Sequence, residues 1–76
     1  MLLGVYHRTD PLEAIGRERI QAMIEEARRQ NISICFFDAE GIDTQRGTVT
    51  AMHPQGDQFH RRETPYPNVV LNESPE

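Results

Sequence analysis

Lysine and tryptophan are absent from the 76 residues of this chain, and cysteine occurs once, at Cys35. Without lysine, the chain forms neither a Schiff base with a carbonyl substrate nor a lysine-containing phosphate-binding loop. A single cysteine excludes an internal disulfide and favours the cytoplasm. No hydrophobic run approaches the roughly 18 residues that span a bilayer. The first residues turn polar too soon for a signal peptide. We therefore expect a cytoplasmic protein with no membrane partner.

Long clusters of positive charge are also missing. The longest runs of arginine are the pairs Arg28-Arg29 and Arg61-Arg62, and the net charge of the chain is −4. This balance argues against a nucleic-acid partner. The glycines do not form a dinucleotide-binding fingerprint, because Gly4 lies inside the first predicted strand and Gly16 inside the predicted helix, whereas the fingerprint needs glycines at the joint between them. The length allows one domain, residues 1–76, and a domain of this size has a small net stability.

Two short segments, residues 2–7 and 32–37, are hydrophobic at successive positions, which is typical of strands covered on both faces. Between them, residues 11–30 carry hydrophobic side chains at helical spacing and predict one helix. Asp10 is a suitable N-cap and Pro11 suits the first helical position. Because Gly16 disfavours helix, the regular helix begins either at Pro11 or near Gly16.

The second half of the chain predicts a β-hairpin over residues 48–62 and a last buried strand over residues 68–72. The polarity of the hairpin places it at a sheet edge or in solvent. The fold class is therefore α/β, with a parallel βαβ core. One helix covers only one face of the sheet, so the three-layer arrangement is incomplete. We expect a partner copy or a further domain to cover the other face.

The carboxyl ends of the first two strands carry the candidate substrate contacts His7, Arg8 and Asp38, because α/β sheets usually bind ligands at this edge. The alternative is structural: Asp10 caps the helix, Asp38 anchors a loop and Arg8 is exposed. The three histidines lack metal-ligand spacing, so no metal site is expected. We predict no catalytic residue.

Candidates for contact with a partner are hydrophobic side chains on the predicted sheet and beside it: Cys35, Phe37, Tyr66 and Val70. A cysteine flanked by Ile34 and Phe36 is also typical of an inert core residue. Tyr66, between two prolines, packs either on the core or against a partner.

The order of these segments, and above all the stretch Thr64-Pro65-Tyr66-Pro67-Asn68-Val69-Val70-Leu71-Asn72, resembles the N-terminal part of the YheC/YheD family of endospore-coat-associated proteins. In that family a similar Pro-x-Pro-Asp-Val-Val-Tyr-Asn-Arg pattern precedes an ATP-grasp domain. Here Asn68 replaces the acid, Leu71 the aromatic residue and Glu73 the basic residue.

The resemblance implies a non-catalytic pre-ATP-grasp domain that packs against the ATP-grasp domain of a longer, sporulation-associated protein. ATP and Mg²⁺ would bind in that second domain, so no cofactor is expected in this chain. The alternative is a free-standing interaction module that self-associates as a homodimer. A small independent enzyme using His7, Arg8, Asp10 and Asp38 is a third interpretation.

Overall fold

The computed structural model describes residues 1–75 and has a mixed α/β fold, which confirms the predicted class. Its six strands form one sheet in the order β3-β4-β2-β1-β6, and β5 pairs with β4. The strands are β1 (Leu2–Tyr6), β2 (Ser33–Phe37), β3 (Ile42–Asp43), β4 (Thr48–Gln55), β5 (Gln58–Pro65) and β6 (Val69–Asn72). The α-helices are α1 (Pro11–Ala14) and α2 (Arg17–Arg29), and the short 3-10 helix η1 covers Ala39–Gly41.

The prediction of one continuous helix over residues 11–30 is wrong, because Gly16 separates α1 from α2. The alternative start near Gly16 is confirmed, since the longer helix α2 begins at Arg17. Gly16 has a φ of 97°, a backbone conformation that side-chain-bearing residues rarely adopt. The Asp10 side chain caps α1 by accepting a hydrogen bond from the Leu12 backbone N–H at 3.1 Å. Asn31 follows α2 with a φ of 59°, as expected of a residue just past a helix end. Neither of these two α-helices of residues 1–75 is long and apolar enough to cross a membrane.

The first hydrophobic cluster lies between α2 and one face of the sheet. β1 pairs in parallel with β2, so that Val5 lies opposite Phe36 and Leu3 opposite Ile34. Because side chains alternate along a strand, these four residues share one face. The buried members of this cluster are Val5, Ile20, Ile24, Ala27, Ile34 and Phe36. The hydrophobic stripe of α2 therefore packs on this face of the sheet and covers it, as predicted.

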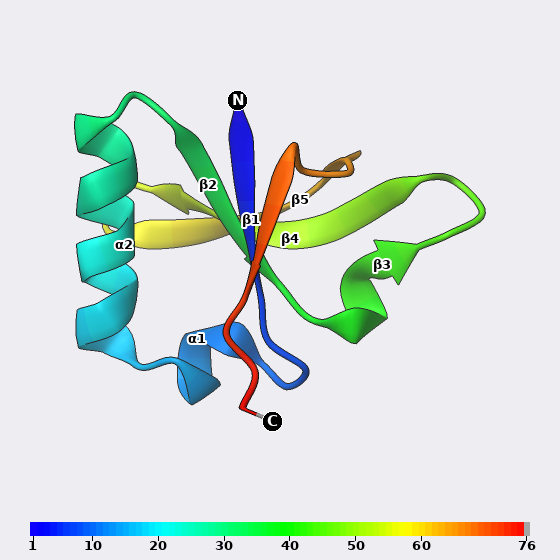
Figure 1. Cartoon of the computed structure of the whole chain (residues 1–76), viewed down its shortest axis with the longest axis horizontal. Helices are drawn as coiled ribbons and strands as arrows, with labels where there is room; N and C mark the ends of the chain where they lie inside the picture. Colours follow the sequence, from blue (N-terminus) through cyan, green and yellow to red (C-terminus); the bar gives the residue numbers. More distant parts are fainter. Residues whose placement is uncertain (76) are drawn as a thin grey trace.

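The second face is covered in part by the chain itself, which corrects the expectation that it is bare. Cys35 and Phe37 form a buried cluster with Val49 and Ala51 of β4. Figure 1 shows the cause: β4 and β5 run crosswise behind β1 and β2. The hairpin lies in the predicted region, with β5 continuing to Pro65. However, the prediction that it lies at an edge or in solvent is wrong for β4, whose alternate residues are buried.

The segment between β5 and β6 closes over the same face at Gly4. A side chain at Gly4 would meet Pro67 Cγ at 2.5 Å and Phe37 Cε1 at 2.8 Å. The hydroxyl of Tyr66 donates a hydrogen bond to the Asp43 carbonyl at 3.3 Å. Pro67 therefore reaches the sheet because residue 4 has no side chain.

Residues 68–72 contain a strand, as predicted, but the prediction that this strand is buried is wrong. β6 pairs in parallel with β1, and in the sheet of residues 1–75 no strand lies on its other side. Its residues Val69, Val70 and Leu71 are 47%, 52% and 42% exposed. The hydrophobic composition of these residues correctly indicates a strand. A strand at the edge of a sheet buries only part of its surface, so β6 remains exposed.

We expect the Cys35 thiol to react with a soluble disulfide reagent only when the protein unfolds. Cys35 is fully buried, and burial raises the pKa of its thiol to about 11. Near pH 8, labelling in buffer should be at least about 1,000-fold slower than in concentrated urea, because exposure requires global opening, which costs roughly 4 kcal/mol or more in a domain of this length. Absorbance of the released thiolate measures the rate. Equal rates in buffer and urea would show that the second face opens locally.

Candidate functional site

The predicted substrate edge brings His7 and Asp38 close together, but their side chains serve local structure. The His7 backbone N–H donates to the Phe37 carbonyl at 3.2 Å, which joins the ends of β1 and β2. His7 is buried, and its Nδ1 accepts a hydrogen bond from the Thr9 backbone N–H at 3.1 Å. Asp38 accepts one from the Glu40 backbone N–H at 3.0 Å and so caps η1. Both side chains therefore stabilise turns.

Arg8 takes no part in the cavity at this edge. Its side chain is exposed, and its backbone N–H donates to Ser74 Oγ at 2.8 Å. The cavity has a volume of about 460 Å³, and Asp38, Asp10, Glu40 and Arg61 supply its charged side chains. His7 lies outside its lining. Within residues 1–75, no group of three or more His, Cys, Asp or Glu side chains is arranged to hold a metal ion.

Three of the four predicted partner contacts line one hydrophobic groove. We call it the Tyr66 groove, and it has a volume of about 390 Å³. Its lining consists of Tyr6, Phe37, Ile42, Val49, Tyr66, Pro67 and Val70. Tyr66 is 49% exposed, whereas Phe37 is largely buried and forms part of the floor. The expectation that Cys35 contacts a partner is wrong for the folded chain, because Cys35 lies fully buried in the cluster with Val49 and Ala51.

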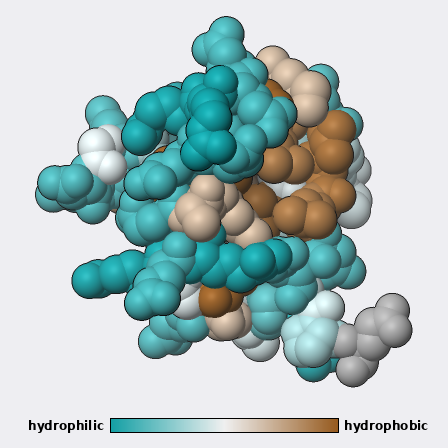
Figure 2. All heavy atoms as spheres, turned by 60° about the vertical axis from the view of Figure 1, so that its left-hand side comes forward, coloured by the Kyte–Doolittle hydropathy of each residue, from teal (hydrophilic) through white to brown (hydrophobic). Residues whose placement is uncertain are grey.

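A second groove lies between α2 and the edge of the sheet, and sequence reasoning missed it. This α2 groove has a volume of about 350 Å³. Hydrophobic residues dominate its lining, among them Leu3, Val5, Met23, Ile32 and Leu71. Figure 2 shows hydrophobic side chains gathered in one hollowed area on this side of the molecule, with hydrophilic side chains around it. The signal in the sequence was the wide hydrophobic stripe of α2, only part of which packs on the sheet.

The strand β6 separates the two grooves and contributes to both. Val69 and Leu71 lie opposite Leu3 and Val5, on the face toward α2, and Val70 lies opposite Gly4 on the other face. Leu71 accordingly lines the α2 groove and Val70 the Tyr66 groove. An edge strand also offers a free row of backbone N–H and C=O groups to another chain. We call β6 together with the two grooves the β6 surface. Its lining is mostly hydrophobic, with the charged side chains of Arg19 and Glu26 in the α2 groove.

Comparison with known proteins found no matching family model, no matching curated protein and no matching solved structure.

Proposed function

We propose that this chain is a non-catalytic docking domain that packs against another folded unit through the β6 surface. The observation that supports this most directly is the exposure of Val69, Val70 and Leu71 between two hydrophobic grooves. Contiguous exposed hydrophobic surface is rare on monomeric proteins unless it binds something. A further domain packed over β6 would remove this surface from water and pair the free strand edge.

The resemblance to the YheC/YheD family identifies an ATP-grasp domain of the same protein as the proposed partner. The stretch that carries the resemblance, residues 64–72, also supplies Tyr66, Val70 and Leu71 of the β6 surface. In this proposal ATP and Mg²⁺ bind in the partner domain, and the protein is cytoplasmic and associated with the spore. The parallel βαβ core belongs to the same proposal, supported by the parallel pairing of β1 with β2 and β6.

Val70→Glu is expected to weaken docking on the ATP-grasp domain that the proposal places downstream. The substitution puts a charge into an interface that is otherwise hydrophobic, and burying an unpaired charge is costly. We expect the affinity to fall at least about tenfold, as at an interface hot spot. The measurement is calorimetric titration of residues 1–76 with the separately expressed domain.

Gln21→Glu is the matched control, because it adds the same charge at an exposed position on α2 outside both groove linings. The affinity of the Gln21→Glu variant for the ATP-grasp domain should equal that of the unmodified chain. Equal weakening by both variants would assign the effect to net charge and contradict docking at β6. A reading frame that stops after Glu76, with no ATP-grasp sequence nearby, would remove this partner from consideration.

Self-association is the second candidate function, favoured by the free edge of β6. Two copies of Val69-Val70-Leu71 related by a two-fold axis can pair antiparallel, with hydrophobic residues meeting on both faces. Sedimentation velocity at protein concentrations up to about 1 mM detects association as weak as roughly −4 kcal/mol. A dimer that Val70→Glu dissociates and Gln21→Glu does not supports this function. A monomer throughout the range contradicts it.

A further inference from the structure

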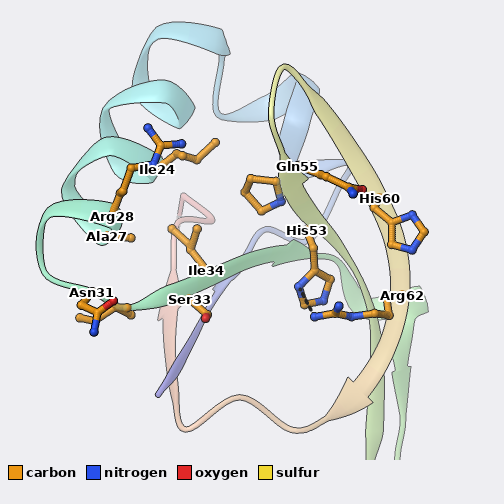
Figure 3. Close-up of a pocket in the computed structure, with 12 residues that line it drawn as sticks. Ile24, Ala27, Arg28, Asn31, Ser33, Ile34, His53, Gln55, His60 and Arg62 are labelled. Carbon is orange, nitrogen blue, oxygen red and sulfur yellow. Dashed lines mark hydrogen bonds between the residues drawn. The ribbon is translucent and has the colours of Figure 1, made fainter.

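A cavity away from the β6 surface lies between the C-terminal part of α2 and the β4–β5 hairpin (Figure 3). It has a volume of about 650 Å³. One wall is hydrophobic and includes Ile24, Ala27 and Ile34. The opposite wall comes from the hairpin and includes His53, His60 and Arg62. We call this cavity the α2–hairpin hollow.

The charge of the hollow is opposite to that of the chain. Arg28, Arg62 and two histidines line it, and its lining contains no aspartate or glutamate, although the net charge of the chain is −4. The ion pairs of residues 1–75 use Arg19, Arg29 and Arg46. Arg28 and Arg62 therefore have no carboxylate within 4.0 Å in this part of the chain. An arginine without a carboxylate partner beside a cavity is available to an anion from solution.

His53 adds a hydrogen-bond donor that lacks an acceptor. The Arg62 guanidinium lies 3.4 Å from His53 Nδ1, and since arginine only donates, Nδ1 is the acceptor. A neutral His53 then carries its proton on Nε2. Burial, Arg62 and His60 together lower the pKa of His53 from its ordinary value, which favours that neutral form. His53 is only 7% exposed, and its Nε2 has no hydrogen-bond partner in residues 1–75.

We propose that the α2–hairpin hollow binds the oxyanion, a carboxylate or a phosphate, of a small organic acid. Arg62 is the principal donor, and the neighbouring His53 supplies a further N–H once its ring adjusts to the ligand. The hydrophobic body of the ligand lies against Ile24, Ala27 and Ile34. Figure 3 shows the Arg62 and His53 side chains next to each other, whereas His60 points away from α2 and is assigned no contact. This site is independent of the docking function proposed above.

The test is an NMR titration of the chain, labelled with ¹⁵N, with benzoate and with phenyl phosphate as probes. We expect saturable shifts at Ser33, His53 and Arg62 with a Kd of about 1 mM, a strength typical of a small fragment. The two probes distinguish a carboxylate site from a phosphate site. Benzyl alcohol, which lacks the charge, should bind at least about tenfold more weakly, since charged hydrogen bonds are the stronger class.

Arg62→Gln should weaken binding of the preferred probe by about tenfold or more. Arg61→Gln is the matched control: it removes the same charge from the neighbouring residue, which lines the separate cavity at Asp38. If Arg62→Gln does not fold, Arg62→Lys keeps the charge and should weaken binding about threefold or more through loss of the guanidinium fork.

Three results would overturn the site. They are the absence of saturable shifts for both acids, equal weakening by Arg61→Gln and Arg62→Gln, and unchanged affinity in Arg62→Lys. Each would mean that the uncompensated arginines do not form a specific anion site. None of them bears on the β6 surface, so this proposal and the docking function fail separately.

Discussion

Phe36→Ala is expected to remove a large part of the stability of the isolated chain. Phe36 is fully buried at the centre of the cluster between α2 and the sheet. Its ring also packs edge-on against Phe59 of the hairpin, with the ring centroids 6.0 Å apart. Truncation of a core phenylalanine costs about 3–5 kcal/mol. A domain of this length has a free energy of unfolding of only roughly 4–11 kcal/mol. Urea denaturation followed by circular dichroism measures the change.

Phe59→Ala is the control for this prediction, because Phe59 is only partly buried and packs on the outside of the same cluster. We expect Phe59→Ala to lower the free energy of unfolding by about half as much as Phe36→Ala or less, because Phe59 buries less surface. The account of the core is wrong if the two substitutions lower the free energy of unfolding equally. That result would mean that Phe59 is packed as tightly as Phe36 and does not lie on the outside of the cluster.

Gly4→Ala is expected to lower the free energy of unfolding by about 1–3 kcal/mol, as in other overpacked sites. In an ordinary strand the same change is stabilising, because glycine costs about 0.5–1 kcal/mol relative to alanine. Here the added methyl group would lie 2.5 Å from Pro67 Cγ and 2.8 Å from Phe37 Cε1. The sign of the effect therefore tests whether the segment after β5 crosses the sheet at residue 4. Thermal and urea unfolding of the two proteins give the comparison.

The double variant Gly4→Ala with Pro67→Ala separates the clash from other effects of alanine. Loss of the Pro67 ring removes the closest contact, so Gly4→Ala should cost less in this background than alone. An equal cost in both backgrounds would place the strain elsewhere. A gain in stability from Gly4→Ala would contradict the crossing altogether.

The sequence was sufficient to predict the elements whose signals are local. Hydrophobic runs over residues 2–7 and 32–37 mark β1 and β2, and the stripe on residues 17–29 marks the covered face of α2. Asp10 marks the start of α1 because its side chain accepts a hydrogen bond from the first turn of the helix. Gly16 was recognised as unfavourable for helix, but only its positive φ divides the segment into α1 and α2.

Features that depend on contacts distant in the sequence were missed. Nothing in residues 48–55 indicates that β4 crosses behind β2 and buries Cys35, because the pattern of alternation there fits a solvated hairpin equally well. The hydrophobic run Val69-Val70-Leu71 has the same composition in a central strand as at an edge, so its exposure depends on which strands flank it.

Part of the α2–hairpin hollow has a signal in the sequence. With the turn placed between residues 55 and 58, antiparallel register sets His53 opposite His60 and brings Arg62 to the same face. The sequence therefore places two histidines and an arginine together on the hairpin. It does not show that α2 forms the opposite wall, because that wall depends on the packing of the helix against β2.

Amide hydrogen exchange tests the docking role of the β6 surface most directly. Exchange is compared between residues 1–76 alone and the same segment joined to, or mixed with, the proposed ATP-grasp domain. The account predicts that the amides of Val69–Asn72 that point away from β1 exchange quickly in the isolated chain and become strongly protected in the assembly. Unchanged exchange at β6, with new protection confined to the outer face of α2, would contradict it.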